Sequence, residues 1–344
     1  MGIRTSFNSI GGSSSNWKVL THPGIISGRD VYLFPSNTHK LLILSMYGQL
    51  LKTDLETISV LNGDNTFFSF DEVYYNNDKN QLLLITTDYT NSITRSYIST
   101  DTNLTTYSAG SLPADPYRKY AETDTKIIYG NGYYVIGGSY YPNTTENPNM
   151  TSQPAIFYST NGNSWTRVLL NTSVVNRTLG GVDQVGYGNS KFIAFGDYFT
   201  NSNDYSCKAV ASSTPKTWTK SSWTDSGHVR VPIIYCNGYF YHYSWNSNFI
   251  RSNDGSTWET LTKPSGFDAE FYNFNVIYHN NLYYLFGRNY FGTTSDFKTY
   301  NRYKLPYSGY NSNQASIVIM DNKIVIGNKG CLYISKISEL EKEV

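Results

Sequence analysis

Residues 249–261 read FIRSNDGSTWETL, and the centre of this stretch follows the spacing S-x-D-G-x-x-W. Such a spacing predicts a tight turn, because the Asp254 carboxylate can accept hydrogen bonds from backbone N–H groups that the turn leaves free, and Gly255 can adopt φ > 0 without a Cβ clash. Trp258 then begins a returning strand and supplies a large apolar ring to bury. One copy predicts a hairpin; several copies would predict a repeat fold.

A second pattern recurs along the chain: an apolar strand, a turn centred on Asn or Gly, and a second apolar strand. The copies lie at 31–45, 73–86, 127–138, 185–196, 233–243, 276–287 and 317–327. Asn-Gly and Asn-Asn centres are typical of hairpins, because both central residues must accept φ > 0. The turns centre near Asn37, Asn77, Asn131, Asn189, Asn237, Asn280 and Asn322, at intervals of 40 to 58 residues. Intervals close to 40–50 are typical of propeller blades with four strands each.

The opening motif reappears between these hairpins. STNGNSW, at 159–165, keeps Gly162 and Trp165 and replaces the acid with Asn161. Looser copies lie at 52–58, 99–107, 212–218 and 294–300. Each unit therefore consists of an inner hairpin followed by an outer hairpin with this turn. We predict an all-β, seven-bladed β-propeller of four-stranded antiparallel blades, with structural turn residues Asp254, Gly255, Trp258, Asn161, Gly162 and Trp165.

The seventh unit lacks its last strand. Residues 330–335 are followed by no Trp-bearing partner, whereas SSNWKVL at 14–20 has the pattern of the missing strand, with Trp17 matching Trp258. An N-terminal strand in this place would close the ring without leaving an exposed sheet edge. The predicted organisation is a flexible arm at 1–13, the propeller at 14–335 and a tail at 336–344.

Composition restricts the classes of function. Charged residues make up 15% of the 344 residues and the net charge is +1, which argues against a nucleic-acid or polybasic membrane surface. No run of about 18 apolar residues is present, and the N-terminus has no apolar segment typical of a signal peptide, so we expect synthesis in the cytoplasm. The three cysteines cannot all pair, and no metal-ligand spacing occurs, so neither a metal nor a cofactor is expected.

The turn at 252–258, and next the turn at 159–165, resembles the Asp-box (BNR) repeat of sialidase-like propellers. The whole unit, such as 185–196, resembles repeats of bacteriophage tail and baseplate propellers, over roughly residues 14–335. The resemblance implies a propeller fold and an architectural role for the turn. Propellers host many unrelated functions, so the resemblance does not identify an activity.

Sialidase-like hydrolases need three arginines and a Tyr–Glu nucleophile pair. Arg29 is placed near the start of the first unit, as in that family, but its neighbours do not match the family's Arg-Ile-Pro signature, and no second or third arginine can be matched. Carboxylate pairs from distant blades remain an alternative that sequence leaves open. We therefore predict a non-enzymatic protein, with a sialidase-like carbohydrate hydrolase and an intracellular scaffold propeller as alternatives.

Long connections rich in tyrosine, asparagine and serine are predicted at 86–92, 113–122, 139–150, 197–206, 222–230, 244–248 and 266–275. They suit a polar ligand, because aromatic rings stack on sugar faces while amides and hydroxyls form hydrogen bonds. They belong to the face opposite the Asp-type turns. The predicted ligand-binding residues are Tyr140, Tyr141, Tyr198, Tyr205, Trp245, Tyr117, Arg118, His228 and Arg230. We predict a virion component (tail, baseplate or head decoration) that contacts other virion subunits, is present in multiple copies and binds a host-surface glycan.

Overall fold

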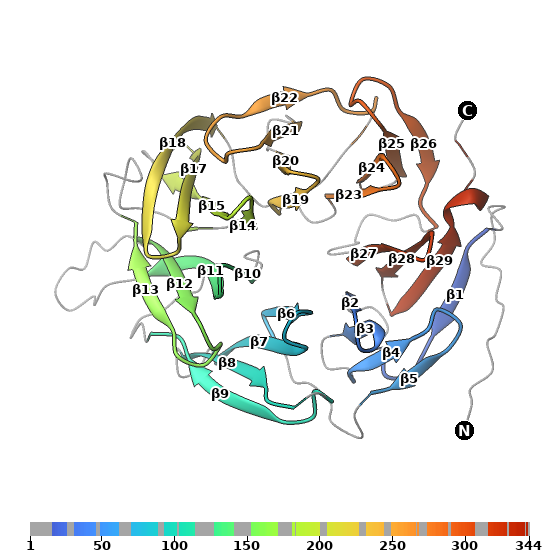
Figure 1. Cartoon of the computed structure of the whole chain (residues 1–344), viewed down its shortest axis with the longest axis horizontal. Helices are drawn as coiled ribbons and strands as arrows, with labels where there is room; N and C mark the ends of the chain where they lie inside the picture. The colour runs from blue at the N-terminus through green and yellow to red at the C-terminus, as the bar shows by residue number, and fades with distance from the viewer. Residues whose placement is uncertain are drawn as a thin grey trace.

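Seven antiparallel sheets surround a central axis in the computed structural model of the protein (Figure 1). The structure describes residues 16–25, 31–45, 49–61, 70–88, 93–101, 103–113, 127–140, 153–170, 181–182, 184–199, 205–226, 232–243, 249–265, 267, 274–287, 290–306, 316–328, 330–340 and 342. The predicted all-β, seven-bladed propeller is confirmed. No helix in these ranges is long and apolar enough to cross a membrane.

The first three blades follow one another along the chain, and in each the strands run from the axis outward in sequence order. Blade 1 contains β2 (Val31–Ser36), β3 (Lys40–Ser45), β4 (Leu51–Thr53) and β5 (Ile58–Val60). Blade 2 contains β6 (Glu72–Asn76), β7 (Gln81–Asp88), β8 (Ile93–Ser99) and β9 (Tyr107–Ser111). Blade 3 contains β10 (Ile128–Gly130), β11 (Tyr133–Tyr140), β12 (Gln153–Ser159) and β13 (Thr166–Leu169).

Blade 4 contains β14 (Gln184–Gly188), β15 (Lys191–Phe195), β16 (Asp197–Phe199), β17 (Tyr205–Thr214) and β18 (Thr217–Ser226). Both β15 and β16 pair with β17, so together they take the place of one interrupted second strand. The interruption falls at Gly196, where a Cβ would lie 2.0 Å from the Gly181 carbonyl oxygen. Close approach of backbone thus explains the break in the strand.

Blade 5 contains β19 (Ile234–Cys236), β20 (Tyr239–Tyr243), β21 (Phe249–Ser252) and β22 (Glu259–Leu261). Blade 6 contains β23 (Asn275–His279), β24 (Leu282–Phe286), β25 (Tyr290–Thr294) and β26 (Asn301–Lys304). Blade 7 contains β27 (Ser316–Met320), β28 (Lys323–Asn328), β29 (Cys331–Lys336) and, as its outermost strand, β1 (Lys18–Thr21). The 3-10 helix η1 (Ile337–Glu339) follows β29.

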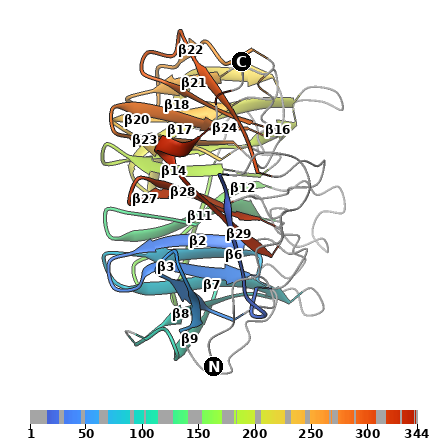
Figure 2. The same cartoon turned by 90° about the vertical axis from the view of Figure 1, so that its right-hand side faces the viewer.

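The N-terminal strand closes the ring as predicted. Figure 2 shows β1, in blue, beside β29, in red, and the register pairs Lys18 with Ile334 and Thr21 with Cys331. Trp17 itself lies immediately before β1, just as Trp258 lies immediately before β22. The edge of β29 is therefore covered by a strand from the opposite end of the chain.

The inner hairpins have the predicted backbone. In blades 3 to 7 both central turn residues have φ > 0, as at Asn131 (46°) and Gly132 (82°). Blades 1 and 2 differ: their turns are longer, and a single described residue at the end of each, Lys40 (65°) or Asn80 (49°), takes the left-handed conformation. These two are the copies whose sequences match the pattern least well.

Hydrophobic residues form one cluster at each of the seven junctions between described blades. Each strand contributes apolar side chains to the junctions on both sides of its blade, because alternate side chains point to opposite faces of a sheet. Leu41 and Ile43 thus pack toward blade 7, whereas Leu42 and Leu44 pack toward blade 2. Two-sided burial explains why the second strands read as continuous apolar runs.

One position of the repeat occurs in all seven clusters. A residue at or next to the start of the outermost strand packs into the junction with the preceding blade. The residues are Ile58, Tyr107, Trp165, Trp218, Trp258, Tyr300 and Trp17 for blades 1 to 7. Trp17 therefore fills the seventh place of this series, although it is far from the others in sequence.

Candidate functional site

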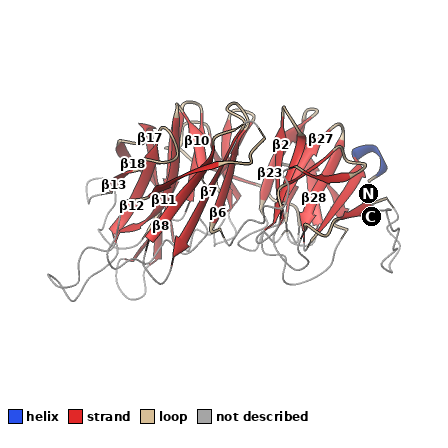
Figure 3. Cartoon of the chain, turned by 90° about the horizontal axis from the view of Figure 1, so that it is seen from below, coloured by secondary structure: helices blue, strands red, loops and turns tan. Residues whose placement is uncertain are grey.

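The two faces of the ring are built differently. The turns of the inner hairpins and those between the third and fourth strands lie together at one end of the blades, drawn in tan in Figure 3. We call this end the turn face. The opposite end, where for example β11 ends and β12 begins, is here called the loop face.

On the turn face, the Asp254 turn has the predicted hydrogen bonds. Asp254 Oδ1 accepts from the backbone N–H groups of Ser256 and Thr257, both at 2.7 Å. Ser252 Oγ accepts from the N–H of Gly255 at 2.8 Å, and Gly255 has φ 74°. The Trp258 indole N–H donates to the Gly255 carbonyl at 3.2 Å. The turn thus satisfies its own backbone groups.

The same geometry recurs where the sequence departs from the motif. Asn161 Oδ1 accepts from the N–H groups of Asn163 (3.0 Å) and Ser164 (2.9 Å), so an amide oxygen replaces the carboxylate. Asp296 Oδ1 accepts from Lys298 and Thr299 in the same way. In blades 1 and 2, the carboxylates of Asp54 and Asp101 accept backbone hydrogen bonds in the corresponding turns. Side-chain and backbone hydrogen bonds from Thr105, with support from Thr106, lower the pKa of Asp101 to about 2.

The asparagines of the inner turns connect neighbouring blades. Asn189 Nδ2 donates to the carbonyl oxygens of Gly238 and Asn253, both at 2.9 Å. Tyr235 OH donates back to Asn189 Oδ1, and its ring lies against Gly188, where a Cβ would come within 2.1 Å of the ring. In the same way, Tyr187 OH donates to Asn131 Oδ1 of the preceding blade, and the Tyr187 ring lies against Gly130.

Polar contacts of this kind are present at every junction between described blades. From blade 1 onward they join Asn37 to Asn77, Asn76 to Tyr134, Asn131 to Ser190, Asn189 to Gly238, Asn237 to Tyr283, Asn280 to Asn322 and, between blades 7 and 1, Lys40 to Asp321. These asparagines and tyrosines of the inner hairpins therefore have an architectural role.

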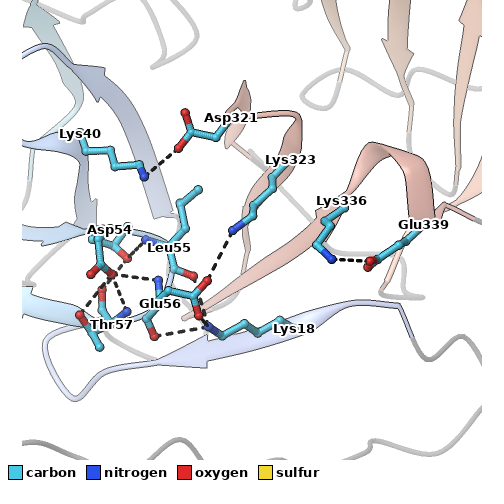
Figure 4. Close-up of polar contacts among 11 residues, drawn as sticks. Lys18, Lys40, Asp54, Leu55, Glu56, Thr57, Asp321, Lys323, Lys336 and Glu339 are labelled. Carbon is cyan, nitrogen blue, oxygen red and sulfur yellow. Dashed lines mark hydrogen bonds and ion pairs between the residues drawn. The ribbon is translucent and has the colours of Figure 1, made fainter.

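The junction of blades 7 and 1 is ionic rather than amide-rich (Figure 4). Glu56 lies between Lys18 of β1 and Lys323 of β28, and the Lys40–Asp321 pair spans 2.7 Å nearby. The Lys18 ammonium, with help from Lys323, holds the pKa of Glu56 below its usual range. Ion pairs thus reinforce the place where the two ends of the chain meet.

Of the nine predicted ligand-binding residues, the structure describes three. Tyr140 is the last residue of β11, Tyr198 lies in β16 and Tyr205 begins β17. The other six lie outside the described residues: Tyr117, Arg118, Tyr141, His228, Arg230 and Trp245. Whether these nine residues bind a ligand stays a prediction.

Several segments that we expected to be connections are strands. Residues 197–199 and 205–207 pair as β16 and β17, with Tyr198 opposite Ser206 and Phe199 opposite Tyr205. Strand β18 continues to Ser226, and β11 includes Ser139 and Tyr140. Strand pairing satisfies backbone N–H and C=O groups that an irregular loop would leave to water, which favours ladder extension in Tyr-, Ser- and Thr-rich sequence. Blades 2 to 4 therefore extend further toward the loop face than blade 5, whose strands have three to five residues.

Sequence reasoning missed one residue near Tyr140. The Arg167 guanidinium carbon of β13 lies 3.6 Å from the centroid of the Tyr140 ring, and both residues are half-buried. A similar pair in blade 6 has Arg302 over Tyr290, also at 3.6 Å. The only sequence signal is the shared spacing in WTR and YNR, with the arginine two residues after the aromatic residue.

Two cysteines and a buried histidine are further potentially reactive groups among the described residues. Burial raises the pKa of the Cys236 thiol to about 12 and also raises that of Cys331, which makes neither thiol a ready nucleophile. His242 is fully buried with its ring 4.7 Å from that of Phe195. Within the described ranges, no group of three His, Cys, Asp or Glu residues is arranged to hold a metal ion.

Comparison with known proteins supports the fold alone. No protein-family model matches the chain, and no curated protein does. Among solved structures, YCF48 bound to D1 peptide has a TM-score of 0.52 at 14% identity, covering 94% of this chain and 96% of that one. The WD40 propeller domain of Doa1 has 0.52 at 13%, covering 93% and 97%. Virginiamycin B lyase from Staphylococcus aureus has 0.51 at 11%, covering 93% and 98%. These similar structures include a peptide-bound protein and a lyase, so the fold leaves the activity open.

Proposed function

We propose that this chain is a non-enzymatic virion protein of a bacteriophage or phage-like particle, in its tail, baseplate or head decoration. In this proposal the loop face binds a glycan of the host surface, and other virion subunits hold many copies of the propeller in the particle. Weak binding at one site would then be multiplied by the copy number.

One observation carries the proposal: the two faces of the ring are used differently. On the turn face, asparagine amides and aspartate carboxylates bind neighbouring blades and turn backbone. On the loop face, strands of blades 3 and 4 are extended, and these extensions include Tyr140, Tyr198 and Tyr205, three of the residues for which we propose ligand binding. Ligands commonly bind loops that a rigid scaffold positions.

The use of carboxylates supports the non-enzymatic part. Asp54, Asp101, Asp254 and Asp296 accept backbone hydrogen bonds in turns. Four others pair with lysine or arginine, namely Glu56, Asp321, Glu259 and Glu339. A glycosidase instead needs two carboxylates that face each other across a substrate site.

Two experiments test the proposal. Mass spectrometry of purified particles should detect the protein in many copies, and its absence from them would refute the virion assignment. Purified wild-type protein should adsorb to host cell walls, whereas the Tyr141→Ala, Trp245→Ala double variant should lose most of this binding, since stacked rings contribute much of the affinity for sugars.

The matched control is Asp254→Asn on the turn face, which should adsorb like the wild type. Adsorption that survives the loop-face double change would reject that face as the binding site. Release of sugar from the cell wall would instead identify a hydrolase.

A further inference from the structure

Arg167 lies in the middle of blade 3, where its backbone pairs with Phe157, and its side chain reaches Tyr140 at the loop-face end of β11. Arg167 belongs to β13, the outermost strand of blade 3. The carbon atom of its guanidinium lies 3.6 Å from the centroid of the Tyr140 ring. Tyr140 ends β11 at the point where the chain leaves the blade. The contact therefore places a positive charge beside Tyr140, which is one of the predicted ligand-binding residues.

One nitrogen of this guanidinium has no partner. The Arg167 Nη1 atom is buried and has no hydrogen-bond acceptor, and no carboxylate of the described residues forms an ion pair with Arg167. A guanidinium carries five N–H donors, and a buried donor without an acceptor is unfavourable. The stacked ring covers one face of the guanidinium but accepts none of its in-plane hydrogen bonds.

Two other arginines show what a satisfied site looks like in this fold. Arg251 pairs with Glu259 while its guanidinium also lies 4.5 Å from the Tyr239 ring centroid. Arg302 lies over Tyr290 at the same distance as Arg167 over Tyr140, but its Nη1 donates to the Ser265 carbonyl at 3.4 Å. Arg167 has the stacking without the acceptor.

We propose that Arg167, positioned by Tyr140, reads a negative charge on the ligand, and that the glycan bound by the loop face is anionic. The inference rests on the proposed function and adds the chemical class of the ligand. A carboxylate or a phosphate presents two oxygens that match the guanidinium fork, which a neutral sugar lacks. The anion would supply an acceptor to the guanidinium, whose Nη1 has none in the described part of the chain.

The test compares three polymers and four proteins. A uronic-acid polysaccharide supplies carboxylates, a polyol-phosphate polymer supplies phosphates, and dextran supplies neither. Wild-type protein should bind one or both anionic polymers more tightly than dextran. Arg167→Gln should weaken anionic binding by about tenfold, the size expected for losing one charge-assisted hydrogen-bonded contact. The affinity of Arg167→Lys for the anionic polymers should lie between those of the wild type and Arg167→Gln, since lysine keeps the charge but lacks the forked pair of donors.

Arg302→Gln is the matched control. It removes an equal charge and an equal stacking contact, and it should bind the anionic polymers within twofold of wild type. Thermal unfolding of each variant establishes that it is folded. The proposal is overturned if Arg167→Gln binds like the wild type, or if Arg302→Gln loses as much affinity.

The outcomes separate this inference from the proposed function. Equal binding of all three polymers, unchanged in Arg167→Gln, would leave a glycan-binding face but reject its anion selectivity. Failure of the wild type to bind any of the polymers or the host cell wall would reject both. Different affinities for the carboxylate and phosphate polymers identify which anion the site prefers.

Discussion

At the residue scale, a single oxygen of Asp254 holds its turn together. Because Oδ1 alone accepts both backbone N–H groups, an amide oxygen should do nearly as well, and Asn161 shows this arrangement within the same chain. We expect Asp254→Ala to lower the free energy of unfolding by about 1 to 2 kcal/mol. Asp254→Asn should cost clearly less. Urea unfolding of both variants checks this, and equal losses would contradict it.

The left-handed position of the turn gives a second prediction at this scale. Gly255 and Gly162 occupy it in two blades, but Leu55, Leu104 and Phe297 adopt φ of 76°, 57° and 56° in others, with buried side chains. A non-glycine residue is strained there by roughly 1 kcal/mol or more. We did not predict a positive φ at these residues, because sequence patterns assign that conformation to glycine. Burial of their side chains offsets the strain.

Leu104 offers the test. Leu104→Ala removes the buried side chain and keeps the strain, so it should cost about 2 to 4 kcal/mol. Leu104→Gly removes both and should be less destabilising than Leu104→Ala by roughly 1 kcal/mol, which reverses the usual order of alanine and glycine. Chemical unfolding of the pair measures the difference. If glycine proves worse than alanine, strain at this position is not significant.

At the element scale, hairpins were predictable where the turn chemistry is strict. Asn-Gly, Asn-Ser and Asn-Asn centres gave inner turns with two positive φ values, whereas the turn ending at Lys40 took another form. The lengths of β16, β17 and β18 were not predictable. Ladder extension there depends on whether two segments find each other in register, and no local residue pattern marks where a polar Tyr/Ser/Thr ribbon stops pairing.

Closure by β1 gives the prediction for an element. Trp17 is half-buried among residues of blades 6 and 7, so Trp17→Ala should cost about 2 kcal/mol, less than for a fully buried tryptophan. Deleting residues 1–20 removes most of β1 and exposes the edge of β29, which should cause unfolding or aggregation. Circular dichroism melts and light scattering report both effects. A truncated protein that melts like the full chain would show that β1 is dispensable.

At the scale of the whole molecule, the repeat made the fold predictable and the site largely not. The seven equivalent residues that include Trp165 and Trp17 follow one spacing rule, and the ring follows from it. The pair of Arg167 and Tyr140 follows no such rule. Its members come from non-adjacent strands and meet only because β12 lies between β11 and β13 in a particular register.

The dependence of the protein's stability on acid pH combines the contributions of several carboxylates. The pKa values of Asp54, Asp101, Asp254, Asp296, Glu56 and Asp321 all lie below their usual range, that of Asp101 at about 2. A carboxylate with a lowered folded-state pKa contributes its stability above its unfolded pKa, near 4, and loses it as the pH falls through the folded value. We therefore expect the melting temperature to be nearly constant between pH 7 and 5 and to fall between about pH 4 and 2.

Glu56→Gln isolates the contribution of the seam between blades 7 and 1. At pH 7 the variant should melt below the wild type, because Lys18 and Lys323 lose their anionic partner. High salt should narrow this difference, since exposed ion pairs are screened. As the pH falls through the lowered folded-state pKa of Glu56, the wild-type carboxyl becomes protonated and resembles the amide, so the difference between the two melting temperatures should shrink. A difference that persists unchanged at the lowest pH would mean that Glu56 stabilises the seam through its shape or neutral hydrogen bonds rather than through its charge.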